Sequence, residues 1–232
     1  MHLRLNYSYI LAFLALTFVL HEGHELAHTV TGRLICGCWG QRDFNIWTTC
    51  ENCNSKWLIL SGIAGPVFTF AVLWFGAWLL RDKNKARQKM LGFSLVFASI
   101  PVGRLINPLF GGGDEVQALD TWLNNWDLSR ILTVVLVVLL CIYPLIKAYR
   151  FVSNKRKLWL FLAFLLLPFV IDLLVVLGLM NTLLNAGLLS MYWVLGSPAL
   201  VTVWTICVCL LFIISRKQLY SLSAEKSEEG KA

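Results

Sequence analysis

The feature that most constrains the fold of this chain is a series of six apolar stretches. They cover residues 7–30, 57–80, 90–109, 131–148, 158–179 and 191–215. A helix needs about 20 predominantly apolar residues to cross the hydrocarbon core of a bilayer. Only 14% of the 232 residues are charged, against about 25% in soluble domains. The sequence therefore predicts an all-α, polytopic transmembrane bundle of about six spans. A single membrane domain over residues 1–222 is followed by a polar, mobile tail at 223–232.

Positive charges are unevenly distributed between the connecting segments. Fifteen of the 20 Lys and Arg residues lie at the N-terminus, in the second and fourth loops and in the C-terminal tail. These segments share one side of a six-span arrangement, and cytoplasmic loops of membrane proteins are enriched in Lys and Arg. We therefore expect an integral, multi-pass protein in the lipid bilayer with both termini in the cytosol. The net charge of +7 then reflects topology, and no nucleic-acid partner is expected.

The far end of the first span carries three histidines within eight residues, and they include an H-E-x-x-H pattern at His24, Glu25 and His28. Residues four apart lie on one face of a helix, so both imidazoles can reach one tetrahedral Zn²⁺. A metal lowers the pKa of its bound water to about 7, and a carboxylate can take the proton. We therefore expect a zinc site toward the extracytoplasmic side, with Glu25 as the base. His21 is a second-shell group, an alternative ligand or an interfacial residue.

A third zinc ligand has to come from another span, because a catalytic zinc keeps three protein ligands and one open position. The third span also runs outward, and it ends in Asn107-Pro108, three glycines and then Asp114. Proline and glycine break the helix at this point and allow a close approach to a site. Asp114 is the first carboxylate after the break and the favoured ligand, with Glu115 and Asp120 as alternatives.

These residues resemble the site-2 protease family of intramembrane zinc metalloproteases. The resemblance rests on the H-E-x-x-H pattern, on an Ala64-Gly65-Pro66 turn in the second span and on Asn107-Pro108 ahead of Asp114. It implies that His24, His28 and Asp114 bind zinc and that Glu25 is the general base. It also implies hydrolysis of peptide bonds in membrane-embedded or membrane-adjacent protein or peptide substrates. Asn107 is then a candidate for binding the substrate, or else an ordinary helix-end amide.

Two other functions are compatible with the same residues. The chain could be a metal-binding membrane protein or transporter whose His and Asp side chains form an ion path. It could also be a catalytically silent, protease-like scaffold. A transporter should place ionisable groups along several spans near the midplane, whereas here they gather at one end. A silent relative tends to lose its base, and Glu25 is present, so the enzyme is the favoured hypothesis.

The loop at 32–56 contains four cysteines, which are Cys36, Cys38, Cys50 and Cys53. Four cysteines this close form either two disulfides or a structural Cys₄ zinc site, unless they remain free thiols. An extracytoplasmic loop lies in an oxidising compartment, which favours disulfides. In either of the first two cases the loop is stapled beside the expected zinc site.

Two charged residues lie inside the predicted spans, Arg104 in the third and Asp172 in the fifth. Charges at this depth are costly and normally paired. Arg104 precedes Asp114 by ten residues, which on a continuous helix is too far for direct contact. We therefore expect structural pairing of Arg104 with Asp172, the alternatives being that they orient a ligand or line a cavity.

Overall fold

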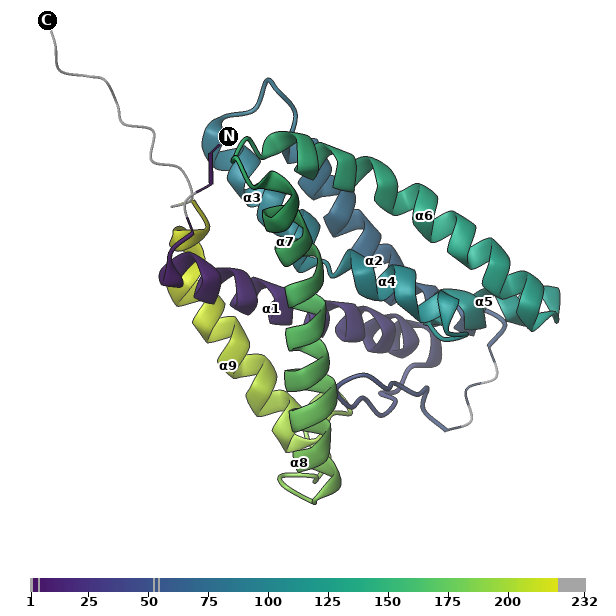
Figure 1. Cartoon of the computed structure of the whole chain (residues 1–232). Helices are drawn as coiled ribbons and strands as arrows, with labels where there is room; N and C mark the ends of the chain where they lie inside the picture. The colour runs from purple at the N-terminus through teal and green to yellow at the C-terminus, as the bar shows by residue number, and fades with distance from the viewer. Residues whose placement is uncertain (1, 4, 52, 54, 221–232) are drawn as a thin grey trace, which may run out of the picture.

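The computed structural model describes residues 2–3, 5–51, 53 and 55–220, and the predicted tail at 223–232 lies outside these residues. Helices form nearly all of the regular structure in this part of the chain (Figure 1). The α-helices are α1 (Tyr7–Cys36), α2 (Leu58–Leu79), α3 (Ala86–Ala98), α4 (Pro101–Leu109), α5 (Asp114–Leu123), α6 (Trp126–Phe151), α7 (Lys157–Asp172), α8 (Asn181–Asn185) and α9 (Ala199–Ser215). A π-helix, η1 (Leu173–Met180), joins α7 to α8, and a 3₁₀ helix, η2 (Arg216–Tyr220), follows α9.

Six helical segments of the described chain are long and apolar enough to cross a membrane. They are Tyr7–Cys36, Leu58–Leu79, Ala86–Leu109, Trp126–Phe151, Lys157–Asn185 and Ala199–Tyr220. The predicted all-α class and the number of spans are confirmed, and the chain is a multi-pass membrane protein. The exposed side chains along these helices are mainly large and apolar, as expected for surfaces that face lipid rather than water.

The third and sixth predicted spans differ most from the structure, the third by an interruption and the sixth by a later start. The third span is interrupted between α3 and α4 at Ile100, whose backbone is left-handed with φ 49°. Such a conformation is strained for a β-branched residue, and Pro101, which has a fixed φ, restarts the helix. The sixth span begins at Ala199 rather than at 191, because the residues before Pro198 form a loop.

Helix α1 is the axis of the bundle and carries the H-E-x-x-H pattern. The Asn6 side chain caps it by accepting from the Tyr9 amide at 2.7 Å, and Gly37 ends it with a left-handed φ of 77°. Its 30 residues correspond to a length of about 45 Å, which exceeds the roughly 30 Å hydrocarbon thickness. His24 and His28 therefore lie in the second half of a helix that is longer than the membrane core.

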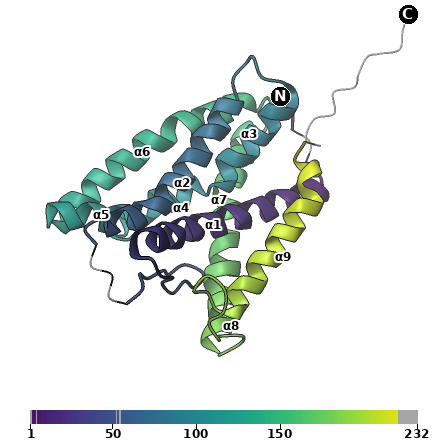
Figure 2. The ribbon, with the colours of Figure 1, turned by 180° about the vertical axis from the view of Figure 1, so that it is seen from behind.

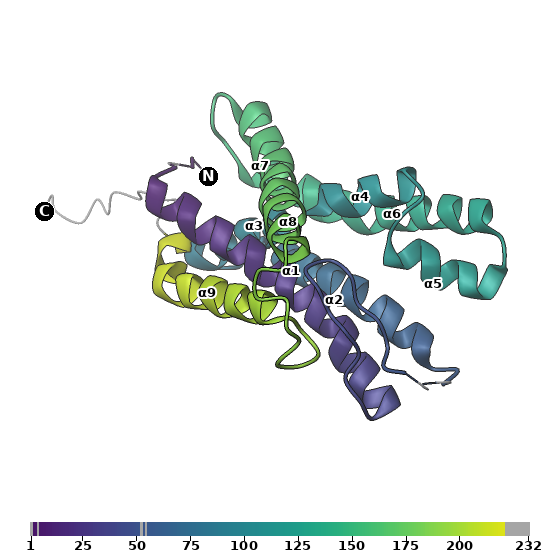
Figure 3. The same ribbon diagram turned by 90° about the horizontal axis from the view of Figure 1, so that it is seen from below.

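Helix α1 lies between α2 on one side and α9 on the other (Figure 3). The larger core joins the first half of α1 to α2, α3, α6 and α7 through stacked and edge-on aromatic rings. Phe164 is central to it, within 4.9–6.1 Å of the ring centroids of Tyr9, Phe13, Phe93 and Phe97. A second core lies between α1, η1 and α9 around Val176 and Val201.

The basic segments gather at one end of the bundle, where the start of α1 meets the end of α9 (Figure 2). Leu3 exchanges two backbone hydrogen bonds with the Asn154 side chain, in the loop between α6 and α7, at 2.8 and 2.9 Å. Arg87 of α3 lies over the Tyr220 ring at 4.2 Å. The segments whose charge indicated a shared side of the membrane are therefore neighbours in the fold.

The loop between α1 and α2 is stapled at the opposite end. Its four cysteines form the disulfides Cys36–Cys53 and Cys38–Cys50, which confirms the favoured expectation of two disulfides; the sequence did not predict which cysteines pair. The alternative of a Cys₄ zinc site is wrong for this structure, because each of the four sulfurs is already bonded to another cysteine in a disulfide. The loop is also shorter than the predicted 32–56, since α1 continues through Cys36.

Candidate metal centre

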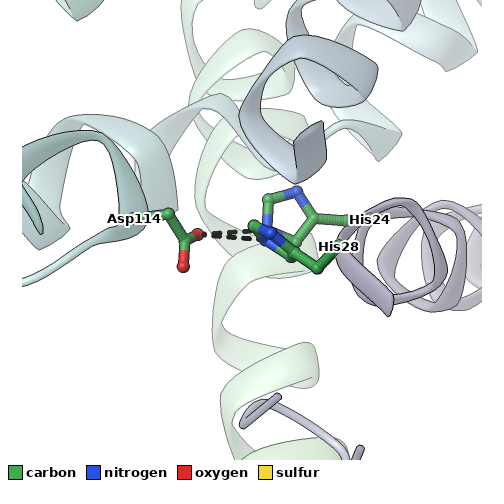
Figure 4. Close-up of side chains that lie close together, drawn as sticks. All are labelled: His24, His28 and Asp114. Atoms are coloured by element: carbon green, nitrogen blue, oxygen red, sulfur yellow. Dashed lines mark hydrogen bonds and ion pairs between the residues drawn. The ribbon is translucent and has the colours of Figure 1, made fainter. Parts of the chain in front are cut away.

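The side chains of His24, His28 and Asp114 converge on one point (Figure 4). The two histidines lie one turn apart on α1, and their Nε2 atoms are 3.2 Å apart. Asp114, the first residue of α5, places its Oδ2 at 3.3 Å from His24 Nε2 and at 3.5 Å from His28 Nε2. Three atoms that can each bind a metal therefore form a nearly equilateral triangle, built from residues 90 positions apart.

Hydrogen bonds from α2 fix the orientation of both imidazoles. His28 Nδ1 lies 2.6 Å from the backbone oxygen of Ser61. A carbonyl oxygen can only accept, so Nδ1 carries the hydrogen and the Nε2 of a neutral ring presents its lone pair. His24 Nδ1 lies 2.9 Å from the Thr69 hydroxyl. Metal-binding histidines typically hold their other ring nitrogen in this way.

Gly65 of α2 lies directly beside both histidines. A methyl group at this position would lie 2.6 Å from His24 Cε1 and closer still to His28 Nε2. The expected Ala64-Gly65-Pro66 turn is wrong, because α2 runs through these residues with Pro66 inside the helix. Because Gly65 has no side chain, the backbone of α2 can pass close to the two histidines at this point.

The loop that follows α1 covers one side of the histidines. The Trp47 ring stacks on His28 with centroids 4.7 Å apart and planes 11° from parallel. Together with α2, this ring buries His28 completely, at 0% exposed. Access to the metal centre is therefore from the other side.

A cavity of about 310 Å³ opens on that other side, between α1, α2, α4, α5 and α7. His24, Glu25 and Asp114 all line it, together with the Asn107 side chain. Its remaining wall contains both polar and apolar residues, and η1 contributes Leu173 and Leu177 to the apolar part. The cavity thus joins the metal centre to a surface suited to apolar side chains.

Glu25 is buried in this cavity wall, at 7% exposed, and its Oε2 has no hydrogen-bond partner among the described residues. A buried carboxylate oxygen without a partner costs free energy. Such an arrangement is typical of functional sites, where substrate or water completes the hydrogen bonds. Glu25 is one residue from His24 and is directed into the same cavity.

Arg104 belongs to this centre, and both it and Asp172 line the cavity, as one of the alternatives from sequence allowed. Its Nη1 lies 3.5 Å from Asp114 Oδ2 and 3.4 Å from Glu115 Oε1, and its Nη2 lies 3.1 Å from His24 Nε2. The expectation that it was too far from Asp114 is wrong, because α4 ends at Leu109 and the chain turns back through Gly111 and Gly113, both at positive φ.

Asp172 pairs with His21 rather than with Arg104, so the expected pairing is wrong. His21 Nδ1 lies 3.1 Å from the Asp172 carboxylate, and its Nε2 lies 2.9 Å from the Phe44 backbone oxygen. Both partners can only accept, so both ring nitrogens carry hydrogen and His21 is an imidazolium. His21 thus links α1 to α7 and the loop, on the wall of the cavity beside Glu25.

The other candidate acids are not part of the triangle. Glu115 binds Arg104, and Asp120 lies on α5 outside the cavity lining, with Oδ1 buried and without a hydrogen-bond partner among the described residues. Burial alone would raise the pKa of Asp114, but its contacts with His24, His28 and Arg104 outweigh this and hold that pKa well below its ordinary value. Asp114 is therefore the ionised acid at the centre.

The triangle fits a zinc ion. Zn–N and Zn–O bonds of about 2.0–2.1 Å in a tetrahedron place neighbouring ligand atoms about 3.3–3.4 Å apart, and the three edges here are 3.2, 3.3 and 3.5 Å. The charges agree. The group contains four acids (Glu25, Asp114, Glu115 and Asp172) and two cations (Arg104 and His21), which with every acid ionised leaves two negative charges for a divalent ion to neutralise.

Comparisons of this chain with protein-family models, with curated proteins and with solved structures find no match. The interpretation of the metal centre therefore rests on its own geometry and on the motif.

Proposed function

We propose that the protein is an intramembrane zinc metalloprotease of the site-2 protease type, with His24, His28 and Asp114 as metal ligands and Glu25 as general base. The observation that carries the proposal is the position of Glu25. Its buried carboxylate, with an oxygen that has no hydrogen-bond partner in the described part of the chain, lines the same cavity as His24 and Asp114. A metal site that only stores or transports ions does not require a carboxylate in this place.

A zinc ion held by the three ligands would polarise the scissile carbonyl and acidify a water molecule. Glu25 takes one proton from the attacking water as the new C–O bond forms, and the π pair of the carbonyl moves onto its oxygen. When the oxygen returns that pair, the C–N bond breaks and Glu25 passes its proton to the leaving nitrogen. The products are a carboxylic acid and an amine, and Glu25 is again a carboxylate.

The surroundings of the cavity support a membrane substrate. The centre lies in the second half of α1, and the cavity walls include apolar residues of α2, α7 and η1. A substrate helix would have to unwind before cleavage, because the carbonyl groups of a helix are already hydrogen-bonded. The cavity is therefore suited to an extended, apolar segment at the edge of the bilayer.

Orientation in the membrane follows from the basic end of the bundle, which carries both the N-terminal segment and η2. We propose that this end is cytosolic and that the metal centre lies toward the extracytoplasmic side. The two disulfides of the loop beside the centre support this orientation, because disulfides persist in oxidising compartments. Ionisable groups gather around one cavity rather than along a path through the spans, which favours an enzyme over a transporter.

The test uses the full chain, purified with zinc and reconstituted in phosphatidylcholine vesicles. Fluorescein-labelled casein and single-span peptides of apolar composition serve as substrates, and mass spectrometry identifies the products. We expect cleavage by the unmodified chain and a loss of about 10²–10⁴-fold in Glu25→Gln at unchanged zinc content. Glu51→Gln, in the exposed part of the loop, is the matched control and should remain active. Equal cleavage by the Glu25→Gln variant would exclude the proposal.

A further inference from the structure

Arg104 brings a guanidinium group to the metal centre from a helix that provides no metal ligand. Its Nη1 is occupied by Asp114 and Glu115 at 3.5 and 3.4 Å, whereas its Nη2 is directed toward His24, 3.1 Å from Nε2. The side chain is 17% exposed and lines the same cavity as Glu25. One edge of the guanidinium is therefore anchored, and the other faces the place where a reacting group would lie.

The backbone is arranged to hold Arg104 in this position. The left-handed Ile100 breaks the third span, and Pro101 starts α4 in a new direction. Strained residues persist where the surrounding structure imposes them and are concentrated at functional sites. On the other side, Glu115 of α5, whose side chain is 9% exposed, fixes the guanidinium. Because Arg104 is held from two sides, its guanidinium does not have to change position when charge develops during a reaction.

Resting on the proposed function, we propose that Arg104 is a catalytic residue that donates a hydrogen bond to the substrate carbonyl oxygen as this oxygen becomes negative, and that Glu115 is the positioning residue for Arg104. From sequence, Arg104 is only a charge inside an apolar span, for which structural pairing is favoured and a contact with a ligand is an alternative.

The chemistry requires such a donor. When water adds to the carbonyl carbon, the π pair of the C=O bond becomes a full charge on oxygen, and this charge returns to the carbon only when the C–N bond breaks. A preorganised donor aimed at the developing charge stabilises the transition state more than the neutral ground state. A guanidinium suits this task because it keeps its charge when buried and has five N–H groups in a fixed plane.

The competing role for Arg104 is purely structural, as a counter-ion that keeps Asp114 and Glu115 together. The two roles make different predictions. A counter-ion affects folding and metal binding, and it does not distinguish a planar ligand from a tetrahedral anion. A transition-state donor affects the binding of tetrahedral anions while the metal stays in place.

The binding experiment uses the full-length zinc-loaded chain and N-phosphoryl-Leu-Trp, a dipeptide with a tetrahedral anionic group, with N-acetyl-Leu-Trp amide as its uncharged partner. We expect Arg104→Gln to bind the phosphoryl dipeptide about 10²-fold more weakly, and Arg104→Lys to be intermediate. Binding of N-acetyl-Leu-Trp amide and zinc content should not change. Arg130→Gln, on α6 away from the cavity, removes the same charge and should have no effect. An unchanged affinity in Arg104→Gln, or loss of its zinc, would overturn the assignment.

Kinetics with labelled casein provide a second measurement. Arg104→Gln should lower kcat by about 10²–10³-fold with little change in KM. Glu115→Ala should lower kcat by a smaller factor, and adding it to Arg104→Gln should have no further effect, because it acts through the arginine. Additive effects would overturn the positioning role of Glu115. If Glu25→Gln cleaves casein as fast as the unmodified chain, the proposed function fails, and the phosphoryl dipeptide still decides whether Arg104 binds the anion.

Discussion

His28 Nδ1 lies 2.6 Å from the backbone oxygen of Ser61, and this contact fixes which nitrogen of His28 can bind a metal. The acceptor is a main-chain atom of α2, so no side-chain substitution removes it. The metal centre is therefore built into the packing of α1 against α2, and its properties should respond to changes on α2 that do not touch a ligand.

Thr69 gives the first prediction, because its hydroxyl lies 2.9 Å from His24 Nδ1. Thr69→Val keeps the shape of the side chain and removes this partner. Loss of such a partner typically lowers metal affinity by 10–100-fold, and we expect a decrease of that size in competition with a zinc chelator. Thr69→Ser retains the hydroxyl and should bind zinc like the unmodified chain. Equal affinities for the valine and serine variants would show that the hydroxyl does not orient His24.

Gly65 gives the second prediction. Gly65→Ala would place a methyl group against both histidines, so α1 and α2 must separate or the rings must turn. We expect weaker zinc binding and a lower midpoint of thermal unfolding. Gly62 lies on the same helix with open space around it, and Gly62→Ala is the matched control. It should be neutral or more stable by up to about 1 kcal/mol. A Gly65→Ala variant indistinguishable from Gly62→Ala would contradict the described approach of α2.

The third prediction concerns the seven cysteines. Cys141, Cys207 and Cys209 are free, and the other four are in disulfides. In chain denatured with a chelator and without reductant, we expect three thiols per chain to react with a maleimide, and seven after reduction. Seven reactive thiols before reduction would instead indicate the Cys₄ metal site that the sequence also allowed.

Glu22 and Arg42 give the fourth prediction. Their side chains are 2% and 3% exposed and lie 3.1 Å apart, with Thr205 donating to the same carboxylate at 2.6 Å. Arg42→Met leaves Glu22 buried without its cation, which typically costs about 3–5 kcal/mol. We expect a correspondingly lower midpoint of unfolding. The double variant Glu22→Leu and Arg42→Met should recover much of this loss. A double variant as unstable as the single one would show that the arginine stabilises by packing alone.

The sequence predicted the class of fold well, because span length and hydropathy are set by the thickness of the bilayer. It also identified His24, Glu25 and His28, whose spacing on one helix is a local property. The helix break ahead of Asp114 made this residue the favoured third ligand, and the structure places Asp114 next to the two histidines.

Contacts between distant segments could not be predicted in the same way. A continuous helix would keep Arg104 away from Asp114, whereas the glycines after Leu109 return the chain toward it. The pairing of Asp172 with His21 depends on how α7 packs against α1, and no periodicity encodes this. The role of Gly65 could have been suspected, since a glycine at the middle of a span permits close packing against a second helix.

The central claim is that one divalent ion is bound between α1 and α5 by His24, His28 and Asp114. Its most direct test is the zinc content of the purified chain after dialysis, measured by mass spectrometry for the unmodified protein and for Asp114→Ala. The account predicts close to one zinc per chain in the unmodified protein and close to none in the variant, with the helical content of both unchanged. Zinc retained in full by a folded Asp114→Ala variant would contradict it.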